Sequence, residues 1–85
     1  MRSVLFEAQT FDDIKFWKKS HPKIISKIID LIDDIQKHPF DGIGKPEPLK
    51  NHLKGFWSRR ITDEHRLVYY VTDATIFIAA CRYHY

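Results

Sequence analysis

Residues 22–39, PKIISKIIDLIDDIQKHP, carry the clearest structural signal in the sequence. Their apolar residues recur every three or four positions and form one stripe, which consists of Ile24, Ile25, Ile28, Ile29, Leu31, Ile32 and Ile35. This spacing predicts an amphipathic helix that begins at Pro22 and ends at His38-Pro39. Because so wide an apolar stripe must be buried against another layer, we expect the helix to lie on a β-sheet.

The residues before this helix predict one strand and another helix. SVLFEA, residues 3–8, is rich in β-branched and aromatic residues and predicts a strand. Thr10 followed by Asp13 forms a weak capping box, so we expect the first helix to begin with Thr10 as its N-cap. The face of this helix that we expect to be buried carries Phe11, Ile14 and Trp17.

The second half of the chain changes from helical to strand periodicity. PFDGIGKPEP, residues 39–48, holds two of the three glycines and three of the four prolines, and therefore predicts a stiff loop. Four strands are expected after it, at residues 49–53, 56–62, 67–72 and 75–83, and their short connections indicate an antiparallel meander. We predict a single domain over residues 1–85 with an α+β fold. Its order is β-α-α-β-β-β-β, with both helices on one face of a twisted, mainly antiparallel sheet.

Composition and charge exclude several classes of protein. The single cysteine, Cys81, excludes an internal disulfide and the multi-cysteine zinc motifs, and no histidine pair has metal-ligand spacing. No signal peptide precedes the domain and no apolar run reaches membrane-spanning length, so we expect a cytoplasmic protein without a membrane partner. The net charge of +3 lies in residues 45–66, which contain six basic and three acidic residues. This segment suits phosphate, although a solvated strand face explains the charge equally well.

The predicted meander brings distant polar residues together. Residues at equal distances from a hairpin turn face each other, so the middle turn places Arg60 beside Arg66. The last turn brings Arg66 opposite the end of the final strand, with His84 just beyond it. The first turn brings Leu49 opposite Arg60, so that Glu47 lies beside the same strand end. We therefore expect these four polar residues to meet at one end of the sheet.

Such a group of side chains suits the cleavage of RNA. Attack by a 2′-hydroxyl needs a base for its proton, an acid for the leaving 5′-oxygen and fixed positive charge around the phosphorane. A carboxylate, a histidine and two arginines supply these roles without a metal or another cofactor, and Lys50 and Tyr85 are within reach. Each residue alone also has an ordinary explanation, as a loop charge, a strand-edge residue or a chain terminus.

The other histidines have weaker claims to a chemical role. His21 and His38 precede prolines at predicted helix ends, where capping is the simpler explanation. His52 is expected to be an exposed strand residue. His65 adjoins Arg66 in a turn, where it could touch a substrate or orient the hairpin.

Four motifs also carry a family resemblance. GKPEPLK (44–50), GFWSRRIT (55–62), EHRLVY (64–69) and ACRYHY (80–85) occur in this order and spacing. Together they resemble YoeB-type toxins of the RelE superfamily, which are the mRNA-cleaving halves of bacterial toxin–antitoxin pairs. The resemblance extends over nearly the whole chain.

The resemblance implies a RelE-like fold and an endoribonuclease that cleaves mRNA in the ribosomal A site, with little activity on free RNA. By the same resemblance the general base is Glu47, the general acid is His84, and Arg66 stabilises the phosphate. The residues that assist in binding or charge stabilisation are Lys50, Arg60 and Tyr85.

The resemblance also implies partners. A YefM- or Phd-like antitoxin would wrap the toxin with an acidic tail, the complex would bind operator DNA, and the toxin would form a homodimer. Two alternatives remain open. One is a toxin of the same fold that inhibits DNA gyrase, which should lack the Glu47, Arg66 and His84 set. The other is a non-enzymatic RNA-binding module that uses the basic strands and aromatic residues such as Trp57 and Tyr83.

Overall fold

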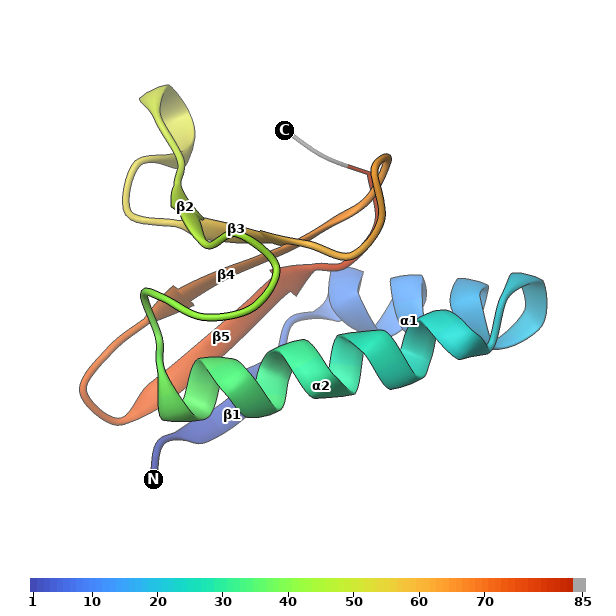
Figure 1. Ribbon diagram of the computed structural model, residues 1–85, viewed down its shortest axis with the longest axis horizontal. Helices are drawn as coiled ribbons and strands as arrows, with labels where there is room; N and C mark the ends of the chain where they lie inside the picture. Colours follow the sequence, from blue (N-terminus) through green and yellow to red (C-terminus); the bar gives the residue numbers. More distant parts are fainter. Residues whose placement is uncertain (84–85) are drawn as a thin grey trace.

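The computed structural model describes residues 1–83 and contains a five-stranded sheet with both helices on one face (Figure 1). The elements along the chain are β1 (Ser3–Phe6), α1 (Ala8–Ser20), α2 (Lys23–Lys37), β2 (Glu47–Pro48), the 3₁₀ helix η1 (Asn51–Leu53), β3 (Trp57–Arg60), β4 (Arg66–Val71) and β5 (Thr75–Ala80). The spatial order is β1-β5-β4-β3-β2, with β1 parallel to β5 and the other pairs antiparallel. The predicted α+β architecture is confirmed. No helix within residues 1–83 is long and apolar enough to cross a membrane.

The stripe on α2 forms the helical half of the core, as its spacing predicts. Ile28, Leu31 and Ile35 are buried in one cluster with side chains from β4 and β5. Burial stabilises the fold by about 1.5–3 kcal/mol for each side chain of this size. Ile29, by contrast, is 59% exposed. The buried face is narrower than the stripe because a helix lying on a sheet covers only its near side.

The predicted start of α1 is wrong, whereas its predicted buried face is confirmed for Trp17, which is buried, and for Ile14, which is half-buried against the core, but not for Phe11. The helix begins at Ala8 after Glu7, without a side-chain cap, and Thr10 lies inside it. Its buried residues are Thr10, Asp13 and Trp17, whereas Phe11 is 56% exposed. The polar residues are buried because they satisfy the backbone at the end of β5, where unpaired groups would be costly.

Three hydrogen bonds show how α1 meets the end of β5. The Thr10 hydroxyl donates to the carbonyl of Ile78 at 2.7 Å. The Asp13 carboxylate accepts from the backbone N–H of Cys81 at 2.9 Å, and the Trp17 indole donates to the Cys81 carbonyl at 2.9 Å. β1 pairs with β5 only as far as Ile78, so α1 takes over where the parallel partner ends.

The final strand is shorter than predicted. β5 ends at Ala80 instead of continuing to residue 83, and Tyr83 has a φ of 63°. Strand alternation therefore does not extend to residues 81–83. The cause is the N–H of Cys81, which bonds to the Asp13 side chain instead of a neighbouring strand.

The strand predicted at residues 49–53 is also wrong. Only Glu47 and Pro48 pair with β3, and a 3₁₀ turn follows at Asn51–Leu53. The Leu49 N–H donates to the Phe56 carbonyl at 2.9 Å. Glu47 therefore lies opposite Ser58, and the predicted pairing of Leu49 with Arg60 does not occur, because the connection is a wide loop and not a two-residue turn.

Candidate active site

Arg60 and Arg66 lie directly opposite each other where β3 and β4 meet at their connecting turn. Cross-strand partners share a face of the sheet. The adjacent pair, Arg59 and Leu67, is fully buried on the helix side. Arg60 and Arg66 therefore belong to the face that the helices leave open. Their juxtaposition, predicted from the turn, is confirmed.

The turn holds the guanidinium group of Arg66 in place. Its Nη1 donates to the carbonyl oxygens of Thr62 at 2.7 Å, Asp63 at 3.2 Å and His65 at 3.1 Å. These bonds restrict the side chain before any ligand arrives, and such preorganisation reduces the entropy lost on binding an anion. Arg66 is thus a fixed positive charge at this end of the sheet.

Glu47 shares the open face with the two arginines. It is the cross-strand partner of Ser58, and Ser58 lies two residues before Arg60 on the same strand. Cross-strand partners lie on the same face of a sheet, and so do residues two apart on one strand. Glu47 therefore lies on the same face as Arg60 and Arg66. Its side chain is exposed, and within residues 1–83 it takes part in no ion pair. The carboxylate can therefore accept a proton from a ligand.

Lys50 lies in the loop that follows β2. Residues 47–53 line a hollow of about 650 Å³, so Glu47 and Lys50 border the same space. Lys50 is exposed and precedes η1 directly. The loop places a cation close to the carboxylate along the chain, although the expected strand is absent.

The last predicted site residues, His84 and Tyr85, lie outside the described residues. Tyr83, the residue before them, is anchored beside Arg66, whose backbone N–H donates to the Tyr83 carbonyl at 2.8 Å. The sequence predicted that Arg66 lies beside the last residues of the chain. This prediction is confirmed for Tyr83, the last residue that the structure describes.

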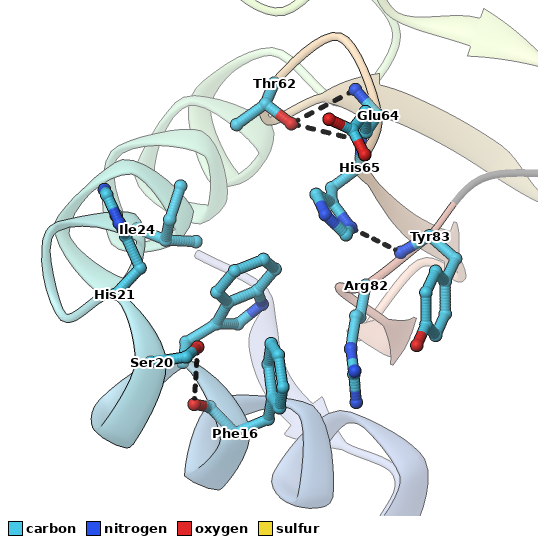
Figure 2. A pocket seen from close by; sticks show the side chains of 10 residues that line it. Phe16, Ser20, His21, Ile24, Thr62, Glu64, His65, Arg82 and Tyr83 are labelled. Carbon is cyan, nitrogen blue, oxygen red and sulfur yellow. Dashed lines mark hydrogen bonds between the residues drawn. The ribbon is translucent and has the colours of Figure 1, made fainter.

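A second hollow lies on the helix side, between α1 and the turn that joins β3 to β4. It has a volume of about 550 Å³, and His65, Arg82 and Tyr83 line it together with Phe16 and Trp17 of α1 (Figure 2). The His65 ring meets the Trp17 ring edge-on at 4.8 Å. Within this hollow His65 Nδ1 accepts a hydrogen bond from the Tyr83 N–H at 2.8 Å.

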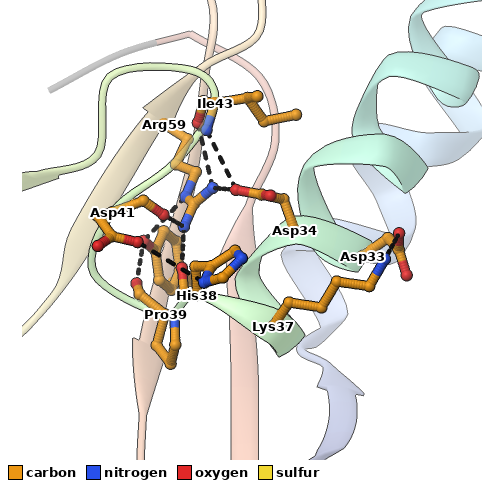
Figure 3. A network of polar contacts seen from close by, with 9 residues as sticks. Asp33, Asp34, Lys37, His38, Pro39, Asp41, Ile43 and Arg59 are labelled. Carbon is orange, nitrogen blue, oxygen red and sulfur yellow. Dashed lines mark hydrogen bonds and ion pairs between the residues drawn. The ribbon is translucent and has the colours of Figure 1, made fainter.

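Arg59, which the sequence places in the basic segment, does not contribute to the surface. It is 0% exposed and forms an ion pair with Asp34 of α2 (Figure 3). Its guanidinium also donates to the carbonyls of His38, Asp41 and Ile43. Arg59 therefore fixes the loop that leads from α2 to β2 and to Glu47.

Tyr69 completes this network. Its hydroxyl accepts from Arg59 Nε at 3.2 Å and donates to the Pro39 carbonyl at 2.8 Å. Burial raises the pKa of Tyr69, and the hydrogen bond from Arg59 holds the pKa of Asp34 below its ordinary value. Sequence reasoning missed the network, although one signal was available. Arg59 alternates with Trp57 and Ile61, two apolar residues, and so occupies an inward position.

Comparisons with known proteins show the family and the fold of the chain. Residues 6–85 match the family model of the YoeB-like toxin of bacterial type II toxin–antitoxin systems. Toxin YoeB of Escherichia coli strain K12 is 55% identical over 82 residues, which cover 96% of this chain and 98% of the relative. The structure of the YoeB dimer from Staphylococcus aureus has a TM-score of 0.92 and 46% identity, covering 99% of this chain and 98% of that chain. The heterotetrameric YoeB–YefM toxin–antitoxin complex from the same organism has a TM-score of 0.89 and 45% identity, covering 100% and 99%.

Proposed function

Because the chain belongs to the family of YoeB-like toxins of bacterial type II toxin–antitoxin systems, we propose that it is a ribosome-dependent endoribonuclease. It cleaves mRNA in the ribosomal A site by attack of the 2′-hydroxyl on the adjacent phosphate. The family membership predicted from the four sequence motifs is confirmed.

One observation carries the proposal: the pair of Arg60 and Arg66 shares the open sheet face with Glu47. A carboxylate and two cations on one exposed surface fit a phosphate with a nearby hydroxyl. The chain end meets the same place, since Tyr83 is bonded to the backbone of Arg66. His84 follows Tyr83 directly in the sequence.

Each residue has a defined part in the proposed reaction. Glu47 removes the proton of the 2′-hydroxyl, and His84 donates a proton to the departing 5′-oxygen. Arg66 stabilises the charge that builds on the phosphorane, and its three bonds to the turn hold it in place for this task. Lys50, Arg60 and Tyr85 bind the neighbouring phosphates or assist that stabilisation. The reaction set needs no metal and no other cofactor.

The partners follow from the family and from the charge of the surface. Like the S. aureus toxin that forms a heterotetramer with YefM, this chain binds a YefM- or Phd-like antitoxin, whose acidic tail fits the exposed basic residues of segment 45–66. The complex, and not the toxin alone, binds operator DNA. The free toxin forms a homodimer and acts in the cytoplasm, where the ribosomes are.

The test is to map cleavage of a message on purified ribosomes with this protein added. Products should carry a 5′-hydroxyl and a 2′,3′-cyclic or 3′-phosphate, and cleavage should persist in EDTA when other ions keep the ribosomes intact. A 5′-phosphate would contradict attack by the 2′-hydroxyl and the role of Glu47. Binding of the message without any cut would favour an RNA-binding module instead, and inhibition of gyrase without cleavage would favour the gyrase-directed alternative.

Substitutions then test the assigned residues. Glu47→Gln and His84→Gln should each slow cleavage by roughly 10²–10⁴-fold, and Arg66→Ala by a comparable or larger factor. Ribosome binding should change much less, because other basic residues still contact phosphate. Glu64→Gln and His21→Gln, at two exposed positions, are the matched controls and should cut at the wild-type rate. Normal cleavage by all three site variants would place the active site elsewhere.

A further inference from the structure

Tyr83 has an unusual backbone conformation for its residue type. Its φ of 63° lies in the left-handed region, which bulky side chains rarely adopt. Such a conformation persists only where the surroundings hold it, and it often marks a functional position. Tyr83 is also the residue that directly precedes His84, so its backbone sets the direction in which the chain continues.

Two consecutive residues hold this backbone from both sides: His65, the last residue of the turn between β3 and β4, and Arg66, the first residue of β4. The N–H of Tyr83 donates to His65 Nδ1 at 2.8 Å (Figure 2). The carbonyl of Tyr83 accepts from the N–H of Arg66 at 2.8 Å. Arg66 is the residue proposed to stabilise the phosphate. Tyr83 is thus fixed both to this turn and to Arg66, and one of the two bonds is made by a side chain.

The His65 ring is itself held by α1. It packs edge-on against Trp17, which is buried and bonded to the Cys81 carbonyl at 2.9 Å. Nδ1 of this ring is the atom that accepts the bond from Tyr83. The guanidinium of Arg82, the residue before Tyr83, lies 3.4 Å from the centre of the Phe16 ring of α1. Helix α1 therefore supports the residues on both sides of the His65–Tyr83 hydrogen bond. His65 reaches Tyr83 from the helix side of the sheet, whereas Glu47 and Arg60 belong to the open face.

We propose that His65 is a positioning residue for the cleavage reaction: its Nδ1 fixes the backbone of Tyr83, the residue directly before the proposed general acid His84, beside Arg66. The inference rests on the proposed function. It assigns His65 no contact with RNA and no proton transfer. The sequence left two roles open for His65, contact with a substrate or orientation of the hairpin, and this inference assigns it a third, the positioning of the Tyr83 backbone.

The test compares two substitutions that separate the ring from its acceptor atom. His65→Phe keeps a ring against Trp17 and removes the acceptor, whereas His65→Asn places an amide oxygen near the position of Nδ1. His65→Phe should reduce the single-turnover cleavage rate roughly 10–100-fold, the usual effect of a small misplacement of a reacting group. His65→Asn should recover most of that loss. His21→Phe, at a histidine that lines the same hollow, is the matched control and should cut at the wild-type rate.

Two further measurements separate positioning from folding and binding. The affinity for ribosomes should be unchanged in His65→Phe, so that the defect lies in the rate at saturation. In NMR spectra the Tyr83 amide resonance should shift in His65→Phe and stay near its wild-type position in His65→Asn. If His65→Phe does not fold, the wild-type protein decides: protection of the Tyr83 amide from hydrogen exchange supports the inference, and exchange at the rate of an unstructured chain overturns it.

The possible failures are distinguishable. If the wild-type protein cuts no message, the proposed function is contradicted. His65 then has no cleavage reaction to support. A wild-type protein that cuts, together with a folded His65→Phe variant that cuts equally fast, overturns this inference alone. A loss in His65→Phe that His65→Asn does not recover assigns the effect to the ring and also overturns it.

Discussion

Replacing Arg59 with methionine should destabilise the protein by about 3–5 kcal/mol, the usual result of removing one partner from a buried ion pair. Arg59 is 0% exposed, and the side chain of its partner Asp34 is only 21% exposed. The substitution leaves this carboxylate without its cation, and it leaves the carbonyls of His38, Asp41 and Ile43 without their donor. Methionine fills much of the volume, so the loss arises from the unpaired polar groups and not from a cavity.

The structure also limits the size of the effect. A carbonyl that stays buried without a partner costs about 1–3 kcal/mol, so the three carbonyls together could exceed the loss from the ion pair. They belong to a surface loop, however, and the loop can move away and expose them to water. Carbonyls that reach water no longer cost the full free energy of an unpaired buried group. We therefore keep the estimate of about 3–5 kcal/mol that applies to the ion pair. For a domain of this size, each kcal/mol lowers the melting temperature by about 4–8 °C, so the expected fall is roughly 12–40 °C.

The assay is urea denaturation followed by tryptophan fluorescence, with calorimetry for the melting temperature. Arg60→Met is the matched control: it changes the next residue, which is exposed, and should alter stability by no more than about 0.5 kcal/mol. The double variant Arg59→Met/Asp34→Leu should regain part of the loss because it removes the unpaired carboxylate. A loss below about 1 kcal/mol for Arg59→Met alone would refute the assignment of Arg59 as a buried structural cation.

Four further expectations follow from the contacts. The pKa of Asp34 is lowered by the hydrogen bond from Arg59, so its stabilisation should be complete above the ordinary value of 3.8 and disappear as the pH falls through the lowered pKa; acid melting curves of Arg59→Met should lack this loss. Ile28→Asp should unfold the domain, because an unpaired buried carboxylate costs several kcal/mol against a total stability of about 5–15; an unchanged circular dichroism melt would mean that the helix face is misassigned. Cys81 is 0% exposed and burial raises its pKa to about 12, so native protein should resist iodoacetamide until denaturant is added, and rapid native labelling would contradict its burial. Deleting residues 83–85 should abolish cleavage and leave the domain folded, and a bulky C-terminal fusion should impair cleavage where an N-terminal tag does not; full activity of the truncated protein would show that the chain end is dispensable.

The sequence alone determined the features that depend on neighbouring residues. The stripe of α2 is visible because helical periodicity places Ile28, Leu31 and Ile35 on one side regardless of what covers them. The pairing of Arg60 with Arg66 was predictable because a short turn leaves little freedom in the register of its hairpin. The four motifs identified the family for a related reason, since they record residue types at fixed spacings.

Only the tertiary structure decided the features in which two distant segments satisfy each other. Thr10 and Asp13 are buried because β5 lacks a strand partner on its β1 side beyond Ile78, and no property of the α1 sequence contains that information. Arg59 points inward because its partners lie on the helix side of the sheet. They are the Asp34 carboxylate and the backbone carbonyls of the loop between α2 and β2. The left-handed backbone of Tyr83, beyond the end of β5, is held by the His65 side chain, which accepts a hydrogen bond from its N–H. In the first two cases a buried polar group must find a partner. In all three, which partner is within reach depends on how the layers pack.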